Sequence, residues 1–128
     1  MGFDWTLFIT LAKELLSIER NTRSPREEYL RTIISRSYYG IFCVARNYLS
    51  SKEASLPEKE IHKFVRSRFI SSTNNLENQI GINMDRLWRK RIEADYYNDA
   101  NINIENVAKV YQTAFRTVEK FRELGAIT

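Results

Sequence analysis

A long helical pattern at residues 25–49 constrains the fold more than any other feature of this sequence. Ser24 can cap the helix and Pro25 suits its first position, while Glu27 and Glu28 suit the positive end of the helix dipole. Its apolar residues recur at helical spacing: Leu30, Ile33, Ile34, Tyr38, Ile41, Phe42, Ala45 and Tyr48. This apolar stripe is too wide for a single neighbour, so the pattern predicts a central helix that is packed on two sides.

Four further segments show apolar residues at helical spacing. These helices are expected at about residues 5–20, 57–70, 76–97 and 104–124. The buried face of the first should carry Leu7, Leu11, Leu15 and Ile18. No segment shows sustained two-residue alternation, repeats or low complexity. The sequence therefore predicts an all-α fold, an up-and-down bundle of four to five helices in a single domain at residues 1–128.

The composition limits the possible classes of function. A formal charge of +4 and a pI near 9.3 allow a nucleic-acid partner without requiring one. Cys43 is the only cysteine, which excludes an intramolecular disulfide and a cysteine-cluster metal site. The longest uncharged run, residues 37–45, is too short to cross a bilayer, and no secretory signal is visible. We therefore expect a soluble cytoplasmic protein that uses no metal and no other cofactor.

The fourth predicted helix carries charged residues where its buried stripe should continue. Ile80, Met84 and Leu87 mark the stripe, which reaches Arg91 and, one turn later, Asp95. A charge that is removed from water is costly unless it is paired, so Arg91 and Asp95 are expected to pair. Two interpretations stay open: a structural ion pair, or a pair that faces a phosphate group.

Other residues of this region offer contacts to nucleic acid. Arg86, Arg89 and Lys90 form either a solvated face or a basic surface that binds RNA phosphates. Trp88 and the pair Tyr38-Tyr39 either pack in the core or stack on bases.

Two residues are candidates for proton transfer. Tyr96 is either an aromatic residue of the core or a catalytic group. His62 is the only histidine and has charged neighbours, so it is either a surface or capping residue or a proton carrier.

A glycine lies inside the central predicted helix. Gly40 costs about 1 kcal/mol relative to alanine in a helix, so it indicates a close approach by another backbone or side chain. The edge formed by Arg36, Ser37 and Gly40 has little bulk. Either a helix of the same chain crosses here, or these residues form the contact between two copies of the chain.

Two motifs lie in the same order on the central and fourth predicted helices. The first contains Ser35-Arg36-Ser37-Tyr38-Tyr39, and the second is Arg91-Ile92-Glu93-Ala94-Asp95-Tyr96. They resemble the Ser-Arg-x-Tyr-Tyr and Arg-x-x-Ala-Asp-Tyr motifs of a prokaryotic branch of HEPN-domain proteins, to which HepT-like toxins are related. Phe3-Asp4-Trp5 and residues 61–64 also fit this branch, so the resemblance covers nearly the whole chain.

The resemblance implies a HEPN-like bundle of four or five helices that is usually a homodimer. Members of the family commonly serve as toxins in toxin–antitoxin pairs or as defence proteins, including antiviral defence. A small nucleotidyltransferase-type antitoxin often accompanies them, and many members are metal-independent RNases.

The chain departs from the family at the catalytic motif, which is an arginine followed after four to six residues by a histidine. Here Arg91 and the four residues after it are followed by Tyr96, and the ordinary tyrosine pKa near 10 makes a poor base at neutral pH. Arg91 could still stabilise phosphate charge, and Asp95 could orient it. Two functions stay open: a HEPN-type toxin or defence protein that acts on RNA through Arg91, Asp95 and Tyr96, and a non-catalytic dimeric module that binds or regulates a nucleotidyltransferase-like partner.

Overall fold

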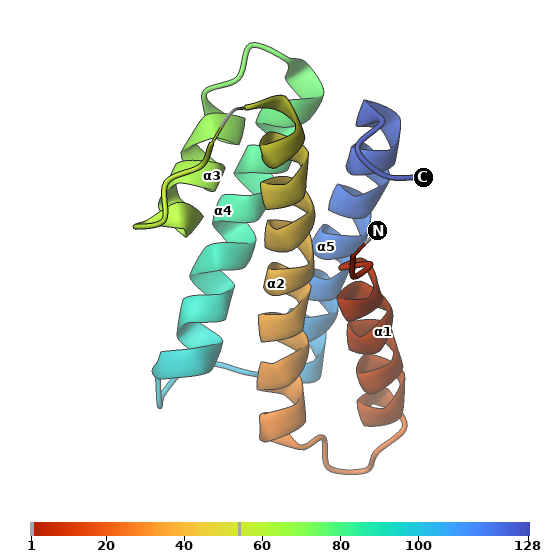
Figure 1. Cartoon of the computed structure of the whole chain (residues 1–128). Coiled ribbons are helices and arrows are strands. Elements are labelled where there is room, and N and C mark those ends of the chain that lie inside the picture. Colours follow the sequence, from red (N-terminus) through yellow and green to blue (C-terminus); the bar gives the residue numbers. More distant parts are fainter. Residues whose placement is uncertain (1, 54) are drawn as a thin grey trace.

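Helices form all the regular secondary structure of residues 2–53 and 55–128, which the computed structural model describes (Figure 1). The helices of this part are α1 (Leu7–Arg20), α2 (Glu27–Lys52), α3 (Ile61–Ile70), α4 (Asn75–Tyr96) and α5 (Ile104–Leu124). The predicted all-α bundle is therefore confirmed. Of the helices described, not one combines the length and the apolar character needed to cross a membrane.

α2 is the central helix, as its wide apolar stripe predicts. It contacts all four other helices; α1 lies on one side of it, α3 and α4 lie on the other, and α5 lies behind it (Figure 1). The largest fully buried side chains include Tyr38, Phe69, Phe121, Ile33, Ile41, Ile80, Met84 and Leu87. The buried stripe of α4 continues from Ile80, Met84 and Leu87 to Ala94, and Arg91 lies between the last two.

α1 crosses α2 at Gly40. A Cβ atom at this position would lie 2.8 Å from Cδ1 of Ile9 and 3.2 Å from Cβ of Phe8, closer than ordinary contact. A crossing within the chain therefore explains the glycine. Gly40 is covered by α1, and Ser37 is also buried inside the chain, so the chain itself covers two of the three positions predicted for a homodimer contact. Only Arg36, which is half-buried, remains accessible there, and the dimer stays a prediction.

The predicted buried face of α1 is wrong. Leu7, Leu11 and Ile18 are 49%, 38% and 51% exposed, while the buried residues of this helix are Ile9, Ala12, Leu16 and Glu19. α1 carries apolar residues on two faces, and periodicity cannot choose between them. The face with Ala12 and Ile9 lies toward the core because it fits closely against Gly40.

Two helices begin later than the proline residues suggest. α2 begins at Glu27, because the buried Glu19 carboxylate accepts a hydrogen bond from the Arg26 backbone N–H at 2.7 Å. α3 begins at Ile61, after Glu60 with a left-handed backbone at φ 53°. The first start thus depends on a residue of another helix, which local capping signals do not show.

Candidate functional site

Arg91 lies where the buried stripe of α4 meets α2. Its side chain is 12% exposed, and its Nε atom lies 2.8 Å from Oδ2 of Asp95, so the predicted pair forms. Its Nη2 atom donates a hydrogen bond to the Tyr39 hydroxyl at 2.8 Å. The Nε–H bond is not directed at the carboxylate, so the contact with Asp95 is ionic without an aligned hydrogen bond.

Aromatic rings surround the Arg91 guanidinium. Its Cζ atom lies 5.0 Å from the centre of the Tyr39 ring and 5.3 Å from that of Trp88. Arg66 of α3 lies over the same Trp88 ring at 4.2 Å. Cations over aromatic faces are attracted by the ring quadrupole. The Trp88 ring therefore makes cation–π contacts with two arginines, Arg66 and Arg91.

Two more arginines lie on the outer face of α2, again over rings. Arg36 lies 5.0 Å from the ring centre of Phe8 and 5.1 Å from that of Tyr39. Arg46 lies 5.6 Å from the ring centre of Trp5. Among the ion pairs of the described residues, neither arginine has a carboxylate partner. We name Arg36, Arg46, Arg66 and Arg91 the arginine cluster.

His62, at the start of α3, lies among these residues. Its ring stacks on Phe42 with 3.9 Å between ring centres, and its Nδ1 atom is hydrogen-bonded to the Tyr38 hydroxyl at 2.7 Å. The centre of the Trp88 ring lies 5.5 Å from that of His62. The prediction that His62 lies at the surface is therefore only partly right: the residue is half-buried.

The surroundings of His62 and Tyr38 shift the pKa of both side chains. Burial lowers the pKa of His62 below its ordinary 6.5, and the charges of Arg91, Arg66 and Arg46 lower it further. Burial raises the pKa of the Tyr38 hydroxyl far above its ordinary value. At neutral pH the histidine is therefore uncharged and the tyrosine keeps its proton.

The predicted RNA-binding residues lie on another face of α4. Arg86, Arg89 and Lys90 line a groove of about 410 Å³ between α4 and α5. Arg89 pairs with Asp85 at 3.0 Å and Lys90 with Glu93 at 3.5 Å. Arg91 is not among the residues that line this groove.

Tyr96 lies at the rim of the site. It is 66% exposed, and the centre of its ring lies 5.5 Å from Cζ of Arg91. It is therefore not a core residue. Asp95, with a side chain 26% exposed, and Tyr96 both lie beside Arg91.

Arg31 of α2 holds the end of α4, and the sequence analysis missed it. Its Nη1 atom donates to the carbonyl oxygens of Ala94 at 2.8 Å and Tyr97 at 2.9 Å, and its Nε atom contacts Glu27 at 2.9 Å. The last carbonyls of a helix lack partners within the helix. Arg31 of α2 supplies the missing hydrogen-bond donors to the last carbonyls of α4, next to Asp95 and Tyr96.

The sequence analysis also missed Arg46, Arg66 and the role of Tyr39. The spacing of His62 and Arg66, four residues apart on α3, is the one signal that could have found part of this group, because residues i and i+4 share a helix face. The contacts of Arg46 and Tyr39 depend on how helices pack, which no local spacing shows.

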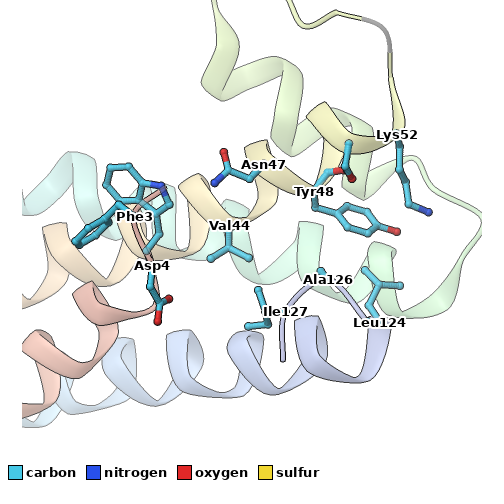
Figure 2. Close-up of a pocket in the computed structure, with 12 residues that line it drawn as sticks. Phe3, Asp4, Val44, Asn47, Tyr48, Lys52, Leu124, Ala126 and Ile127 are labelled. Atoms are coloured by element: carbon cyan, nitrogen blue, oxygen red, sulfur yellow. The ribbon is translucent and has the colours of Figure 1, made fainter. Parts of the chain in front are cut away.

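A pocket of about 460 Å³ lies away from the cluster, where the two ends of the chain meet the last turns of α2 (Figure 2). Its walls include Phe3, Asp4, Asn47, Tyr48 and Lys52, and the C-terminal residues Ala126 and Ile127 cover one side. It holds one lysine and one carboxylate and lacks the arginines and the histidine. Elsewhere in the described part of the chain, no three histidine, cysteine, aspartate or glutamate side chains gather as metal ligands would.

Comparison of the chain with models of protein families, with curated proteins and with solved structures found no match. The HEPN resemblance therefore stays a prediction that depends on the two motifs.

Proposed function

We propose that this chain is a HEPN-type toxin or defence-associated protein that acts on RNA, and that the arginine cluster binds RNA phosphates. The observation that carries the proposal is the way the arginines are held. Each guanidinium lies over at least one aromatic ring. Such stacking fixes the planar group and leaves donor N–H bonds for an oxyanion.

The balance of charge supports an anionic ligand. The carboxylate of Asp95 neutralises part of the positive charge of Arg91. Asp85 lies 4.0 Å from Arg66 and also pairs with Arg89, so its charge is shared between the two arginines. Arg36 and Arg46 keep their full charge as far as the described residues show. A local excess of positive charge attracts phosphates and makes the affinity depend on salt.

Hydrogen bonds that are not made support it as well. Nη1 of Arg66 and Nε of Arg91 are buried and make no hydrogen bond with residues 2–53 or 55–128. Buried donors without acceptors are uncommon in folded proteins, and these two N–H groups are available to an oxyanion. A bound phosphate would add the negative charge that the cluster lacks.

The test measures affinity for a labelled single-stranded RNA of mixed sequence between about 50 and 200 mM salt. Arg36→Gln and Arg46→Gln should each lower the affinity and reduce the salt slope by about 1, because each removes one phosphate contact. Arg122→Gln is the matched control, since Arg122 is exposed on α5 and contacts Glu119 at 2.6 Å. Absence of salt-dependent binding, or an equal loss in the control, contradicts the proposal.

A second candidate is a non-catalytic dimeric HEPN module that pairs with a nucleotidyltransferase-type partner, and α1 favours it. Its outer face exposes Leu7, Leu11 and Ile18, and a helix that is apolar on two sides is usually covered on both. Light scattering at about 50 µM should show a dimer that Leu11→Glu converts to a monomer. A strict monomer in both samples contradicts self-association.

A further inference from the structure

The histidine that the α4 motif lacks has a counterpart on α3. We infer that His62 is the catalytic proton carrier of this site and takes the 2′-hydroxyl proton of a bound RNA. This inference depends on the proposed action on RNA. It assigns a role to a residue that lies outside both sequence motifs.

The imidazole is fixed on two sides. Tyr38 holds Nδ1 at 2.7 Å, and Phe42 covers one face of the ring at 3.9 Å between centres, with 17° between the planes. For Nε2, no hydrogen-bond partner occurs among the described residues. The only ring nitrogen left for a substrate is therefore Nε2.

His62 and Arg91 flank the same two rings. The centre of the His62 ring lies 5.5 Å from that of Trp88 and 5.8 Å from that of Tyr39. Cζ of Arg91 lies 5.3 Å and 5.0 Å from the same two centres. A phosphate held by Arg91 thus lies in the neighbourhood of the imidazole, which in-line cleavage of RNA requires.

The protonation state suits a base. Five titratable or charged groups contact His62 or act on its charge: Tyr38, Tyr39, Arg46, Arg66 and Arg91. The three arginines and burial disfavour the imidazolium, so Nε2 or Nδ1 carries a free lone pair at neutral pH. When Nδ1–H donates to the Tyr38 oxygen, that lone pair is on Nε2.

The reaction needs no reactant other than the RNA and solvent water. Nε2 accepts the 2′-hydroxyl proton while the 2′-oxygen forms a bond to phosphorus. The bond from phosphorus to the 5′-oxygen breaks; this leaving oxygen, on the far side of phosphorus from the imidazole, takes a proton from water, and the imidazolium gives its proton back to the solvent. The products are a 2′,3′-cyclic phosphate and a 5′-hydroxyl, so no atom or electron is gained or lost. Arg91 balances the extra negative charge of the phosphorane.

The experiment compares binding and cleavage in the same variants. Affinity is measured with a 2′-O-methyl RNA of mixed sequence, which has no 2′-hydroxyl proton, and cleavage with the unmodified RNA. His62→Gln should lower the cleavage rate about 100-fold or more and leave the affinity within about twofold of the original. Lys63→Gln, an exposed change on the same turn, is the control and should leave both unchanged.

A second variant and the pH profile exclude a purely structural effect. The cleavage rate should rise with pH through a midpoint that lies below 6.5, because burial and the three arginines lower the pKa of His62 below its ordinary value. Tyr38→Phe keeps the ring and removes the hydroxyl that orients Nδ1. It should slow cleavage about tenfold and move the acid limb of the profile, which simple loss of fold would not do.

The outcomes separate the two proposals. Cleavage by His62→Gln at the original rate overturns the inference, and so does an original protein that binds RNA and leaves it intact at every pH. Both results leave the proposed RNA binding in place. If the original protein does not bind 2′-O-methyl RNA, the proposed function fails, and this inference fails with it.

Discussion

One partly buried arginine–carboxylate pair joins the end of α1 to the start of α2, and another lies at the end of α4; their hydrogen bonds differ. Glu19, in the last turn of α1, is fully buried, and its carboxylate accepts hydrogen bonds from the Arg26 backbone N–H at 2.7 Å and from Nη2 of Arg26 at 2.5 Å. Arg91 and Asp95 are 2.8 Å apart without an aligned hydrogen bond.

Hydrogen-bond satisfaction separates the two pairs better than burial or spacing does. The carboxylate of Glu19 has its donors within the chain, so the pair needs nothing more to be stable. Arg91, in contrast, lies near further arginines. Its own Nε and the Nη1 of Arg66 are buried donors without an acceptor. We therefore interpret Glu19–Arg26 as a structural pair and Arg91–Asp95 as part of a binding site.

The largest expected effect concerns Arg91. Arg91→Met should weaken RNA affinity about 10- to 100-fold, because a charged hydrogen bond to phosphate is lost. It should change the melting temperature little, since Asp95 can reach water. RNA titration and thermal melting of the same sample check both statements. The double change Arg91→Met with Asp95→Leu should stay folded and not recover affinity; a double variant with full affinity contradicts the role given to the pair.

Glu19 should behave in the opposite way. Glu19→Ala leaves Arg26 and its backbone N–H without their acceptor, so the melting temperature should fall by about 5 °C or more while RNA affinity is kept. Calorimetry and the same RNA titration test this. A loss of affinity at unchanged stability would reverse the interpretation of the two pairs.

The same pair predicts how stability depends on pH. Hydrogen bonds from Arg26 lower the pKa of Glu19 below its ordinary 4.5 in the folded state. Its contribution is therefore present above pH 4.5 and disappears as the pH falls through the folded-state value. Melting temperatures from pH 6 down to about 3 should decline less steeply for Glu19→Gln than for the original protein. Parallel curves would mean that another carboxylate controls acid unfolding.

Arg31 should give a smaller effect that reaches the site indirectly. Arg31→Met removes the guanidinium that donates hydrogen bonds to the carbonyl oxygens at the end of α4. It should lower the free energy of unfolding by about 1–2 kcal/mol. Amide hydrogen exchange should accelerate in the last turn of α4 and stay unchanged in α5. Uniform acceleration over all helices would contradict a local role.

The smallest effect is expected at the groove between α4 and α5. Arg89 and Lys90 form exposed ion pairs with neighbours on the same helix. Arg89→Gln with Lys90→Gln should change stability by no more than about 0.5 kcal/mol and RNA affinity less than Arg46→Gln does. If the double variant loses more affinity than Arg46→Gln, the RNA surface lies on this groove.

The sequence predicts the helices well because each one is defined by nearby residues. Apolar periodicity gave all five, and Asn74 and Asn103 cap α4 and α5 by accepting hydrogen bonds from the backbone three residues later. Apolar periodicity could not identify the buried face of α1, because Leu11 and Ile9 are both apolar and lie on different faces. Ile9 is buried because it packs against Gly40 of α2. That choice depends on the packing of two helices.

The site was predictable in part. Arg91 and Asp95 are four residues apart on one helix, so their pairing follows from local geometry. His62, Tyr38 and Arg46 come from different helices or distant turns, and their proximity follows only from the tertiary fold. The family motif places its histidine on α4, whereas His62 lies on α3.

Both tryptophans of the chain contact members of the arginine cluster: Arg46 lies over Trp5, and Arg66 and Arg91 lie over Trp88. The tryptophan fluorescence of the protein therefore originates next to the cluster, so ligand binding there can be followed without an attached dye. In a Trp5→Phe variant, the tryptophan emission comes from Trp88 alone, so a titration with phosphate or RNA would give an optical signal from one position on α4, beside Arg66 and Arg91.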